Sequence, residues 1–552
     1  MATVSKLPGS QWRSVIESAM YANSVKRTNM RELYDLASKQ PEVIVTSEPM
    51  YKPEAFGLSS DARVLVSNDG KIVGRTAKAR RLVRQMGVER DRYLTILREA
   101  VYHFNTRPAL WLEGIVGLHP DFMVKAHLIS PANDAKNMMD WALNFTPWME
   151  PWVSTYNKSR EINEPDIIVL ADSQWSDPAF PDGLIIVDET QNCIAILGLR
   201  YFGERKKGTL TLAWSMGVRQ NMVACHGGIK KIGDKPPIAF FGLSGSGKSS
   251  LTNSPDHDGT LTPEETVTVI HDDAFLIDLN HNLTVALEPN LFDKTDAVKF
   301  EDPIIKYFYS AQNMGVTVKD GQIKLLGGDV RNRNGRCIKT RDMFKIADYC
   351  ERPGMVVWLQ KDTSLPPVSR IKTTGLAVAM GASLSTMRAK GVENVDAREF
   401  EKLVIEPFAN PFRVHPLMWD CNQFKALFKS GTECYILNTH AFGTPEELID
   451  IPKELTLLIV TQMVRGNIEW KDWKAFKGLE IPKNGKELFG VDFDKKYKPS
   501  KDKKYLAFMR ERMQDRVTFL SDKRDKERDM DSAFIDTLLT ARTVIDQILS
   551  PI

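Results

Sequence analysis

The chain has little of what would mark it as secreted, membrane-bound or built around a structural metal. Its 552 residues include six cysteines, at positions 193, 225, 337, 350, 421 and 434, with no C-x-x-C spacing. This usage argues against a disulfide framework or a zinc finger and favours a reducing compartment. No window approaches the roughly 18 consecutive apolar residues of a membrane span, and the first twenty residues lack the apolar core of a signal peptide. We therefore expect a soluble cytoplasmic protein without a membrane partner.

An excess of charge of one sign is also missing. The 74 Lys and Arg residues nearly balance 71 Asp and Glu residues, which leaves a formal net charge of +3. Such a balance gives no reason to expect a nucleic-acid partner. The mixed-sign run over 495–516 is more typical of a solvated helix face than of a patch that binds polyanions. With 42% hydrophobic and 26% charged residues, the chain has the composition of a globular protein of two or more domains.

The hydrophobic pattern changes along the chain and predicts an α/β protein. The first 150 residues or so suggest mostly helix, with apolar residues at helical spacing over 11–39 and 77–105. Short β-rich runs bounded by turn residues follow, and two later segments, 452–466 and 532–550, are again typical of helices. The strands are expected within 165–172, 183–189, 192–203, 208–218, 236–243, 265–278, 353–362 and 431–443. We expect a mixed α/β substrate-binding domain (1–225), a nucleotide- and metal-binding domain (226–480), and a charged helical extension (481–552), with the active cleft between the two domains.

A phosphate-binding loop is the clearest motif. Residues 242–250, GLSGSGKSS, fit G-x-x-x-x-G-K-[ST] between an expected strand and a helix start, which is the context that distinguishes such a loop from a chance glycine turn. Its backbone N–H groups would point at phosphate oxygens, Lys248 would reach the β- and γ-phosphates, and Ser249 would bind a metal ion. The residues expected to hold the nucleotide are Gly242, Leu243, Ser244, Gly245, Ser246, Gly247, Lys248, Ser249 and Ser250.

Carboxylates and nitrogen ligands occur on either side of this loop. Asp272 and Asp273 end a predicted strand, where one of them could bind a metal ion, although such a pair also begins turns. Lys207 and His226 precede the loop. A lone histidine is more often a satisfied polar residue than a ligand, and a lysine must lose its proton to bind a metal. These residues alone therefore leave the metal site open.

In their order along the chain, these motifs resemble ATP-dependent phosphoenolpyruvate carboxykinase. That family carries a Y-x-G-E-x-K-K-G strand, a metal-binding histidine, a G-L-S-G-T-G-K-T-T loop and an aspartate pair, which are similar to YFGERKKG (201–208), CHGG (225–228), the loop and HDDAF (271–275). Further segments also match, over about residues 60–470. They are GRTAKAR (74–80), LFDKTDAVKFEDPII (291–305), RNGRCI (333–338), LPPVSR (365–370) and YILNTHAFG (435–443).

The resemblance implies a two-domain fold with a P-loop domain, and a role for each matched residue. Lys207, His226 and Asp273 would hold Mn²⁺, and a second ion, Mg²⁺ or Mn²⁺, would sit on Ser249 with ATP. The substrate residues would be Arg75 and Arg336, which orient a dicarboxylate, Tyr201, which lies against it, and Lys294, which stabilises charge near the departing CO₂. The implied reaction is the decarboxylation and phosphorylation of oxaloacetate to phosphoenolpyruvate.

The chain also departs from the family pattern. Ala274 and Phe275 stand where the family has glutamate and histidine, and no arginine follows Thr439 in the place of the family's adenine-binding arginine. The segment over 381–395, at the position of the family's lid loop, matches weakly. A different nucleotide is therefore an open alternative. So are a kinase of the same fold that acts on another small acid or a protein serine, and a non-catalytic nucleotide-binding protein. The oligomeric state cannot be read from the sequence.

Overall fold

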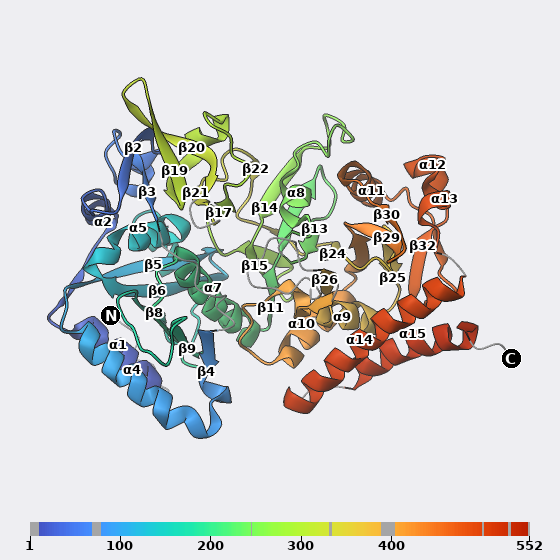
Figure 1. Ribbon diagram of the computed structural model, residues 1–552, viewed down its shortest axis with the longest axis horizontal. Coiled ribbons are helices and arrows are strands. Elements are labelled where there is room, and N and C mark those ends of the chain that lie inside the picture. Colours follow the sequence, from blue (N-terminus) through green and yellow to red (C-terminus); the bar gives the residue numbers. More distant parts are fainter. Residues whose placement is uncertain are drawn as a thin grey trace. The chain divides into compact units, whose positions relative to one another are not determined.

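The computed structural model describes residues 10–68, 79–243, 245–330, 334–387, 403–499, 502–527 and 532–549 (Figure 1). Arg75, Ser244 and the part of the expected lid from residue 388 to 395 lie outside these residues. The chain divides into two compact units. The first comprises Met1–Arg219, Val285–Met343 and Phe412–Val414, and the second comprises Gln220–Thr284, Phe344–Pro411 and His415–Ile552. The domain boundaries expected at 225 and 480 stay a prediction.

An eight-stranded mixed sheet forms the centre of the first unit. Its central strands are continuous apolar runs that are buried on both faces, as expected where helices cover a sheet. Trp12 and Leu97, from helices α1 (Gln11–Ser18) and α4 (Arg90–Phe104), pack in one core with Leu170 and Ile186 of the sheet. The strand order is β1 (Val25–Arg27), β5 (Ala109–His119), β6 (Phe122–Pro131), β8 (Ile167–Asp172), β10 (Cys193–Leu197), β9 (Leu184–Asp188), β4 (Arg80–Leu82), with β7 (Thr146–Pro147) beside β5.

A second, five-stranded sheet of this unit contains two of the predicted substrate residues. Its order is β17 (Leu291–Lys294), β21 (Arg336–Lys339), β18 (Phe308–Gln312), β3 (Arg63–Ser67), β2 (Ile44–Pro49). Phe308 and Val64 contribute to its apolar core. A hairpin of β19 (Met314–Lys319) and β20 (Gln322–Val330) follows β18. Two distant parts of the sequence thus meet in one sheet, because β18 pairs in parallel with β3.

The helices of the first unit confirm part of the sequence prediction and correct the rest. Helix α4 lies inside the helical segment predicted over 77–105, and α1 and α2 lie inside 11–39. The expectation of a mostly helical N-terminus is wrong for 109–131, where β5 and β6 form long strands. The remaining helices of the unit are α2 (Met30–Ala37), α5 (Ala135–Asn144), α6 (Trp152–Asn157) and α7 (Phe202–Arg219).

The strands expected over 201–208 and 208–218 are wrong, because both segments belong to α7. This helix is buried on nearly every side, so it lacks the apolar stripe by which a surface helix is found in a sequence. Its Thr, Leu and Trp residues are also common in strands, and periodicity alone does not separate a buried strand from a buried helix. Within the helix, Thr209 Oγ1 donates to the Arg205 carbonyl oxygen (2.9 Å) and accepts from Trp141 Nε1 (2.9 Å).

A nine-stranded sheet forms the core of the second unit. Strands β13, β24 and β28 are parallel neighbours, so their carboxyl ends lie at one edge of the sheet, where α/β proteins commonly bind ligands. The order is β22 (Lys345–Ile346), β14 (Val267–His271), β12 (Gly228–Ile232), β13 (Ile238–Phe241), β24 (Met355–Gln360), β28 (Glu433–Asn438), β25 (Val368–Ile371), β32 (Leu479–Pro482), β31 (Trp470–Asp472). These strands, together with the first unit, confirm the predicted α/β class.

Smaller sheets complete the second unit. A four-stranded sheet has the order β11 (Met222–His226), β15 (Ala274–Asp278), β16 (Leu283–Ala286), β23 (Tyr349–Glu351). Two hairpins follow, made of β26 (Ser385–Met387) with β27 (Leu403–Ile405) and of β29 (Ala441–Thr444) with β30 (Glu447–Asp450). The segment expected as one strand over 265–278 is in fact two, β14 and β15, with the aspartate pair between them.

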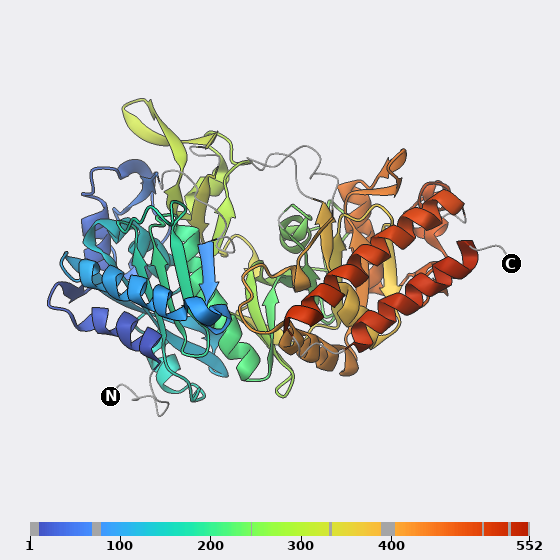
Figure 2. The same ribbon diagram turned by 60° about the horizontal axis from the view of Figure 1, so that its bottom comes forward.

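The predicted C-terminal helices are present and pack onto the second unit. Helices α14 and α15 lie side by side (Figure 1 and Figure 2). Met509 and Leu538 of these helices are fully buried, as is Arg516. The helices of the unit are α8 (Lys248–Asn253), α9 (Thr374–Ala382), α10 (Leu417–Lys429), α11 (Lys453–Arg465), α12 (Gly485–Phe489), α13 (Phe493–Tyr497), α14 (Lys503–Glu527) and α15 (Ala533–Leu549). Among the described residues, no helix has both the length and the apolar character to cross a bilayer.

Candidate functional site

The phosphate loop leaves the end of β13 and enters α8 at Lys248, as its sequence predicts. Gly245 (φ +84°) and Gly247 (φ +87°) adopt left-handed backbone conformations that other residues rarely take. Gly242 is required for another reason, because a Cβ at this position would stand 2.8 Å from Leu359 Cβ and 2.2 Å from Ser246 Oγ. The loop is exposed at Gly245, and so are Ser249 and Ser250 at the start of the helix. An anion can therefore reach the loop from solvent.

Lys248 connects the phosphate loop to Asp272, the first residue of the aspartate pair. Lys248 Nζ donates to the Asp272 carbonyl oxygen and lies 3.8 Å from Asp272 Oδ1. Asp272 Oδ2 accepts a hydrogen bond from Asn253 Nδ2 of α8 (3.0 Å). The Asp272 side chain, which is 4% exposed, is thus directed toward the helix that follows the loop.

His226 and Asp273, the two predicted metal ligands of the second unit, lie close together. They lie at the end of β11 and directly before β15, and His226 is the register partner of Ala274. His226 Nε2 is 3.1 Å from Asp273 Oδ1. Two ligands that bind one ion at about 2.1 Å and at a right angle lie about 3 Å apart, so this spacing fits an octahedral divalent cation. No group of three or more His, Cys, Asp or Glu side chains arranged for a metal ion occurs within the described residues.

The His226 ring is held by a contact at Nδ1, the ring nitrogen that does not face Asp273. Nδ1 lies 2.6 Å from the Ala409 carbonyl oxygen. Because a carbonyl oxygen only accepts, Nδ1 carries a proton, and Nε2, which faces Asp273 Oδ1, is the nitrogen left to bind a metal ion when it is deprotonated. Phe408 (φ +52°) and Ala409 (φ +55°) have left-handed backbone conformations, which are uncommon for residues with a side chain and for bulky ones in particular. The Phe408 ring stacks on Phe424, with centroids 4.4 Å apart, which anchors this segment.

His271 is a positioning residue that the sequence analysis missed. Its Nδ1 accepts hydrogen bonds from the backbone N–H groups of Asp273 and Ala274, both at 2.9 Å. The His271 side chain is fully buried. It therefore holds the turn that presents Asp273 to His226. A histidine at the end of a strand, two residues before the carboxylate, was the available signal in the sequence.

We expect His271→Ala to weaken Mn²⁺ binding about tenfold or more, because a partner that orients a ligand typically contributes that much to metal affinity. His271→Asn should recover most of the affinity, since an asparagine Oδ1 can stand where Nδ1 accepts. Mn²⁺ affinity measured by electron paramagnetic resonance, with circular dichroism as a folding control, checks this prediction. Unchanged affinity in the folded alanine variant would exclude the positioning role.

In the first unit, the predicted substrate residues gather around the ring of Phe292 on β17. Tyr201 packs against this ring with centroids 6.3 Å apart, and the Arg336 guanidinium carbon lies 6.0 Å from its centre. Lys206 Nζ lies 5.5 Å from the same ring. Lys294 and Arg336 are register partners on adjacent strands, and the Lys294 side chain is exposed. The structure thus brings Tyr201, Lys294 and Arg336 together, with the concentration of positive charge that an anionic substrate requires.

Lys207 lies on α7, also in the first unit. Its Nζ is 4.7 Å from the ring centre of Phe412 and 5.6 Å from that of Trp214. Its neighbour Lys206 is 1% exposed and is paired with Glu288 (Nζ to Oε2, 3.2 Å). The two consecutive lysines therefore have different surroundings, since Lys206 is held by a buried carboxylate and Lys207 is only half-buried.

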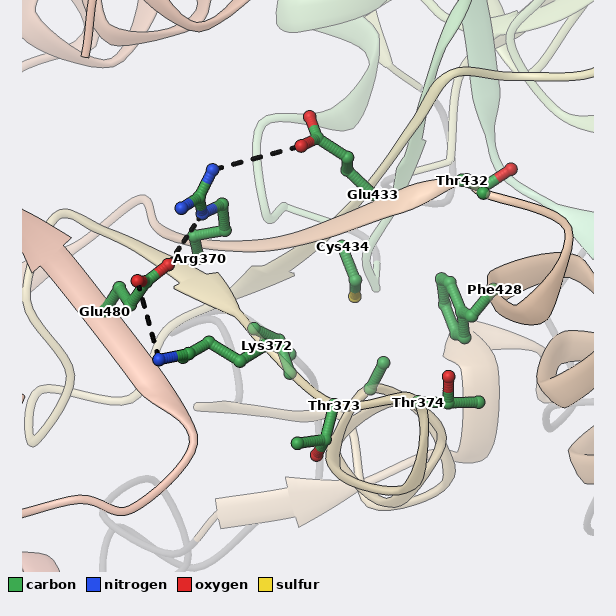
Figure 3. A pocket seen from close by; sticks show the side chains of 12 residues that line it. Arg370, Lys372, Thr373, Thr374, Phe428, Thr432, Glu433, Cys434 and Glu480 are labelled. Atoms are coloured by element: carbon green, nitrogen blue, oxygen red, sulfur yellow. Dashed lines mark hydrogen bonds and ion pairs between the residues drawn. The ribbon is translucent and has the colours of Figure 1, made fainter. Parts of the chain in front are cut away.

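A pocket that no predicted site residue lines lies elsewhere in the second unit (Figure 3). It has a volume of about 380 Å³ and includes Glu433 and Cys434, at the start of β28. It is therefore at the opposite edge of the sheet from the phosphate loop. Both basic side chains of its lining are paired, because Arg370 Nε is 2.7 Å from Glu480 of the lining and Lys372 Nζ is 2.8 Å from Asp472, which lies outside it. This pocket is not the nucleotide site.

The comparisons with known proteins agree with this arrangement. The family model for phosphoenolpyruvate carboxykinase matches residues 35–490. Phosphoenolpyruvate carboxykinase (ATP) of Candida glabrata is 26% identical over 477 residues, which cover 78% of this chain and 81% of that protein. The protein of the same name from Dictyostelium discoideum is 23% identical over 431 residues, covering 72% and 73%. That of Saccharomyces cerevisiae is 24% identical over 424 residues, covering 70% and 72%. The resemblance inferred from the motifs is confirmed, and the chain belongs to the phosphoenolpyruvate carboxykinase (ATP) family.

Proposed function

We propose that this protein converts oxaloacetate and ATP to phosphoenolpyruvate, CO₂ and ADP, and catalyses the reverse reaction. The observation that carries the proposal is the family match over residues 35–490, within which the phosphate loop and the His226–Asp273 pair are both intact. The kinase and non-catalytic alternatives start from the departures at Ala274 and after Thr439, and the family match does not favour them.

We propose that His226 and Asp273 bind Mn²⁺, and that Lys207 is a further ligand of this ion. The donor set fits, because nitrogen ligands suit Mn²⁺ better than Mg²⁺. A second ion, Mg²⁺ or Mn²⁺, is proposed to bind at Ser249 with the nucleotide. When bound, the ions would supply positive charge against the negative charge that develops on oxygen during phosphoryl transfer. The ring orientation set by Ala409 keeps His226 Nε2 available for this role.

The other protein groups are proposed to orient the two substrates. Lys248 contacts the β- and γ-phosphates of ATP, and the loop amides hold the phosphate oxygens. Arg336 binds a carboxylate of oxaloacetate, as does Arg75, which lies outside the described residues, and Tyr201 lies against the substrate. Lys294 stabilises the charge that remains as CO₂ departs. We also propose a cytoplasmic location, in keeping with six cysteines that are all present as thiols. The proposed partners are the small-molecule substrates and the nucleotide.

The forward reaction tests the proposal directly. Purified protein would be incubated with Mn²⁺, Mg²⁺, ATP and oxaloacetate, and the phosphorus products would be followed by ³¹P NMR. A phosphoenolpyruvate signal that requires oxaloacetate is the expected result. Parallel samples with a small hydroxy acid or a serine-containing protein in place of oxaloacetate should give no phosphorylated product. Phosphorylation of one of these acceptors, with no phosphoenolpyruvate from oxaloacetate, would replace the proposal by a kinase function.

A further inference from the structure

Lys361 lies beside the phosphate loop, although no motif drew attention to it. It follows β24 directly, and β24 is the parallel neighbour of β13, from whose end the loop departs. Lys361 Nζ is 3.9 Å from the point at which a Cβ would stand on Gly245. Gly245 is in the exposed middle of the loop, three residues before Lys248 in the sequence. A second ammonium group thus faces the loop from another strand.

The Lys361 ammonium has no hydrogen bond or ion pair with any of the described residues. The acid next to it in the sequence, Asp362, is fully buried and directed elsewhere. Asp362 Oδ1 accepts from Ser364 N (3.1 Å) and Ser364 Oγ (2.7 Å), and Oδ2 accepts from Arg516 Nη2 (2.6 Å). Because Arg516 and Ser364 occupy both carboxylate oxygens, Asp362 does not compensate the charge of Lys361.

The surroundings of Lys361 make it a suitable cation for an anionic ligand. Partial burial lowers the pKa of Lys361, since its charge is removed from water without a partner to compensate. Burial and then the positive charge of Lys361 lower the pKa of His440, which follows β28. A lowered pKa favours the neutral imidazole of His440, which then adds no positive charge beside Lys361. Thr439 Oγ1 donates to the Ser246 carbonyl oxygen (2.8 Å), which ties the end of β28 to the loop.

We propose that Lys361 is a second phosphate-binding lysine of this site, and that it contacts the polyphosphate of the nucleotide from the Gly245 side of the loop. The inference rests on the proposed function in one respect, namely that the loop holds a nucleoside triphosphate. A bound polyphosphate would supply the anion that Lys361 lacks within the described residues. Lys248 at the start of α8 and Lys361 directly after β24 would then hold the phosphate chain from two sides.

The test measures binding rather than turnover. Isothermal titration of the full-length protein with Mg-ATP, AMP and inorganic tripolyphosphate would compare the wild type with Lys361→Gln, Lys361→Arg and Lys248→Ala. Lys372→Gln is the matched control, because that lysine lies in the same unit but at the opposite sheet edge and is paired with Asp472. Lys361→Gln should weaken ATP and tripolyphosphate binding by about tenfold or more, the loss expected for one charge-assisted hydrogen bond.

The other variants separate the possible outcomes. AMP binding should change less in Lys361→Gln, Lys361→Arg should retain most of the affinity, and Lys372→Gln should match the wild type. The ligand-free Tm of Lys361→Gln should equal or exceed that of the wild type, because an unpaired half-buried charge is removed.

If Lys361→Gln binds ATP as tightly as the wild type while Lys248→Ala binds it more weakly, the proposed role of Lys361 is wrong and the proposed function stands. A wild-type protein that binds neither ATP nor tripolyphosphate would overturn both proposals. The expected binding pattern without phosphoenolpyruvate formation would support Lys361 and overturn only the proposed reaction.

Discussion

Replacing Asp273 with asparagine should lower kcat at least about a hundredfold and weaken Mn²⁺ binding by a similar factor, because a metal ligand contributes more than the groups that orient it. The substitution keeps the size and planarity of the side chain. It removes the negative charge that lies 3.1 Å from His226 Nε2. An amide oxygen is a weaker ligand for a divalent cation than a carboxylate, and the amide nitrogen is not a ligand at all.

Asp272→Asn is the matched control for this prediction. Asp272 is the preceding residue and an aspartate as well, but its side chain is directed to Asn253 and Lys248 of α8. In the absence of nucleotide, we expect this variant to bind Mn²⁺ within about threefold of the wild type, since the His226–Asp273 pair is unchanged. Mn²⁺ titration followed by electron paramagnetic resonance measures both variants. Equal losses at the two positions would contradict the assignment of Asp273 as the ligand.

Replacing Arg516 with methionine should destabilise the second unit by about 3–5 kcal/mol, the usual cost of leaving one partner of a buried ion pair uncompensated. Arg516 and Asp362 are both fully buried. Arg516 also donates to Gln360 Oε1 (2.7 Å) and Ser385 Oγ (2.7 Å). The C-terminal helix α14 therefore supplies polar contacts to the end of β24, directly beside the phosphate loop. Urea unfolding followed by fluorescence measures the change.

Two further variants control this prediction. Arg510→Met removes another arginine of α14. Because Arg510 and its partner Asp546 are both partly exposed, we expect the free energy of unfolding to fall by less than about 1 kcal/mol. Asp362→Asn combined with Arg516→Met should recover part of the stability, because the buried carboxylate charge is then removed as well. If Arg516→Met and Arg510→Met each lower the free energy of unfolding by the same small amount, the buried Arg516–Asp362 pair does not stabilise the second unit.

The sequence was sufficient to predict those parts of the site that depend on local pattern. The phosphate loop needs consecutive residues of fixed type between a strand and a helix, so 242–250 could be predicted without any long-range information. His226 and Asp273 were predicted as ligands from their order in the motifs, and their approach to 3.1 Å follows from the pairing of β11 with β15. Periodicity located α4 and α11 because each has an apolar face and a polar face.

Other features depend on contacts between residues that are far apart in the chain. Helix α7 was predicted as strand because it is buried on nearly all sides, which removes the helical period from its sequence. The grouping of Tyr201 and Arg336 around Phe292 arises from distant segments that meet in one unit. Lys361 looked like the polar end of a strand, and its relation to Gly245 became visible only when β13 and β24 were known to be parallel neighbours.

Whether this chain catalyses a carboxykinase reaction that depends on the phosphate loop is measured most directly in the reverse direction. Purified protein with Mn²⁺ and Mg²⁺ would receive phosphoenolpyruvate and bicarbonate together with ADP, GDP or phosphate, and malate dehydrogenase would report oxaloacetate. A bicarbonate-free sample and Lys248→Ala serve as controls. We expect the wild type to form oxaloacetate with ADP and bicarbonate. Lys248→Ala should lose at least about a hundredfold in rate, because a group that stabilises phosphoryl transfer is removed. Folded, metal-loaded wild-type protein that forms no oxaloacetate with any acceptor would contradict the proposed carboxykinase reaction.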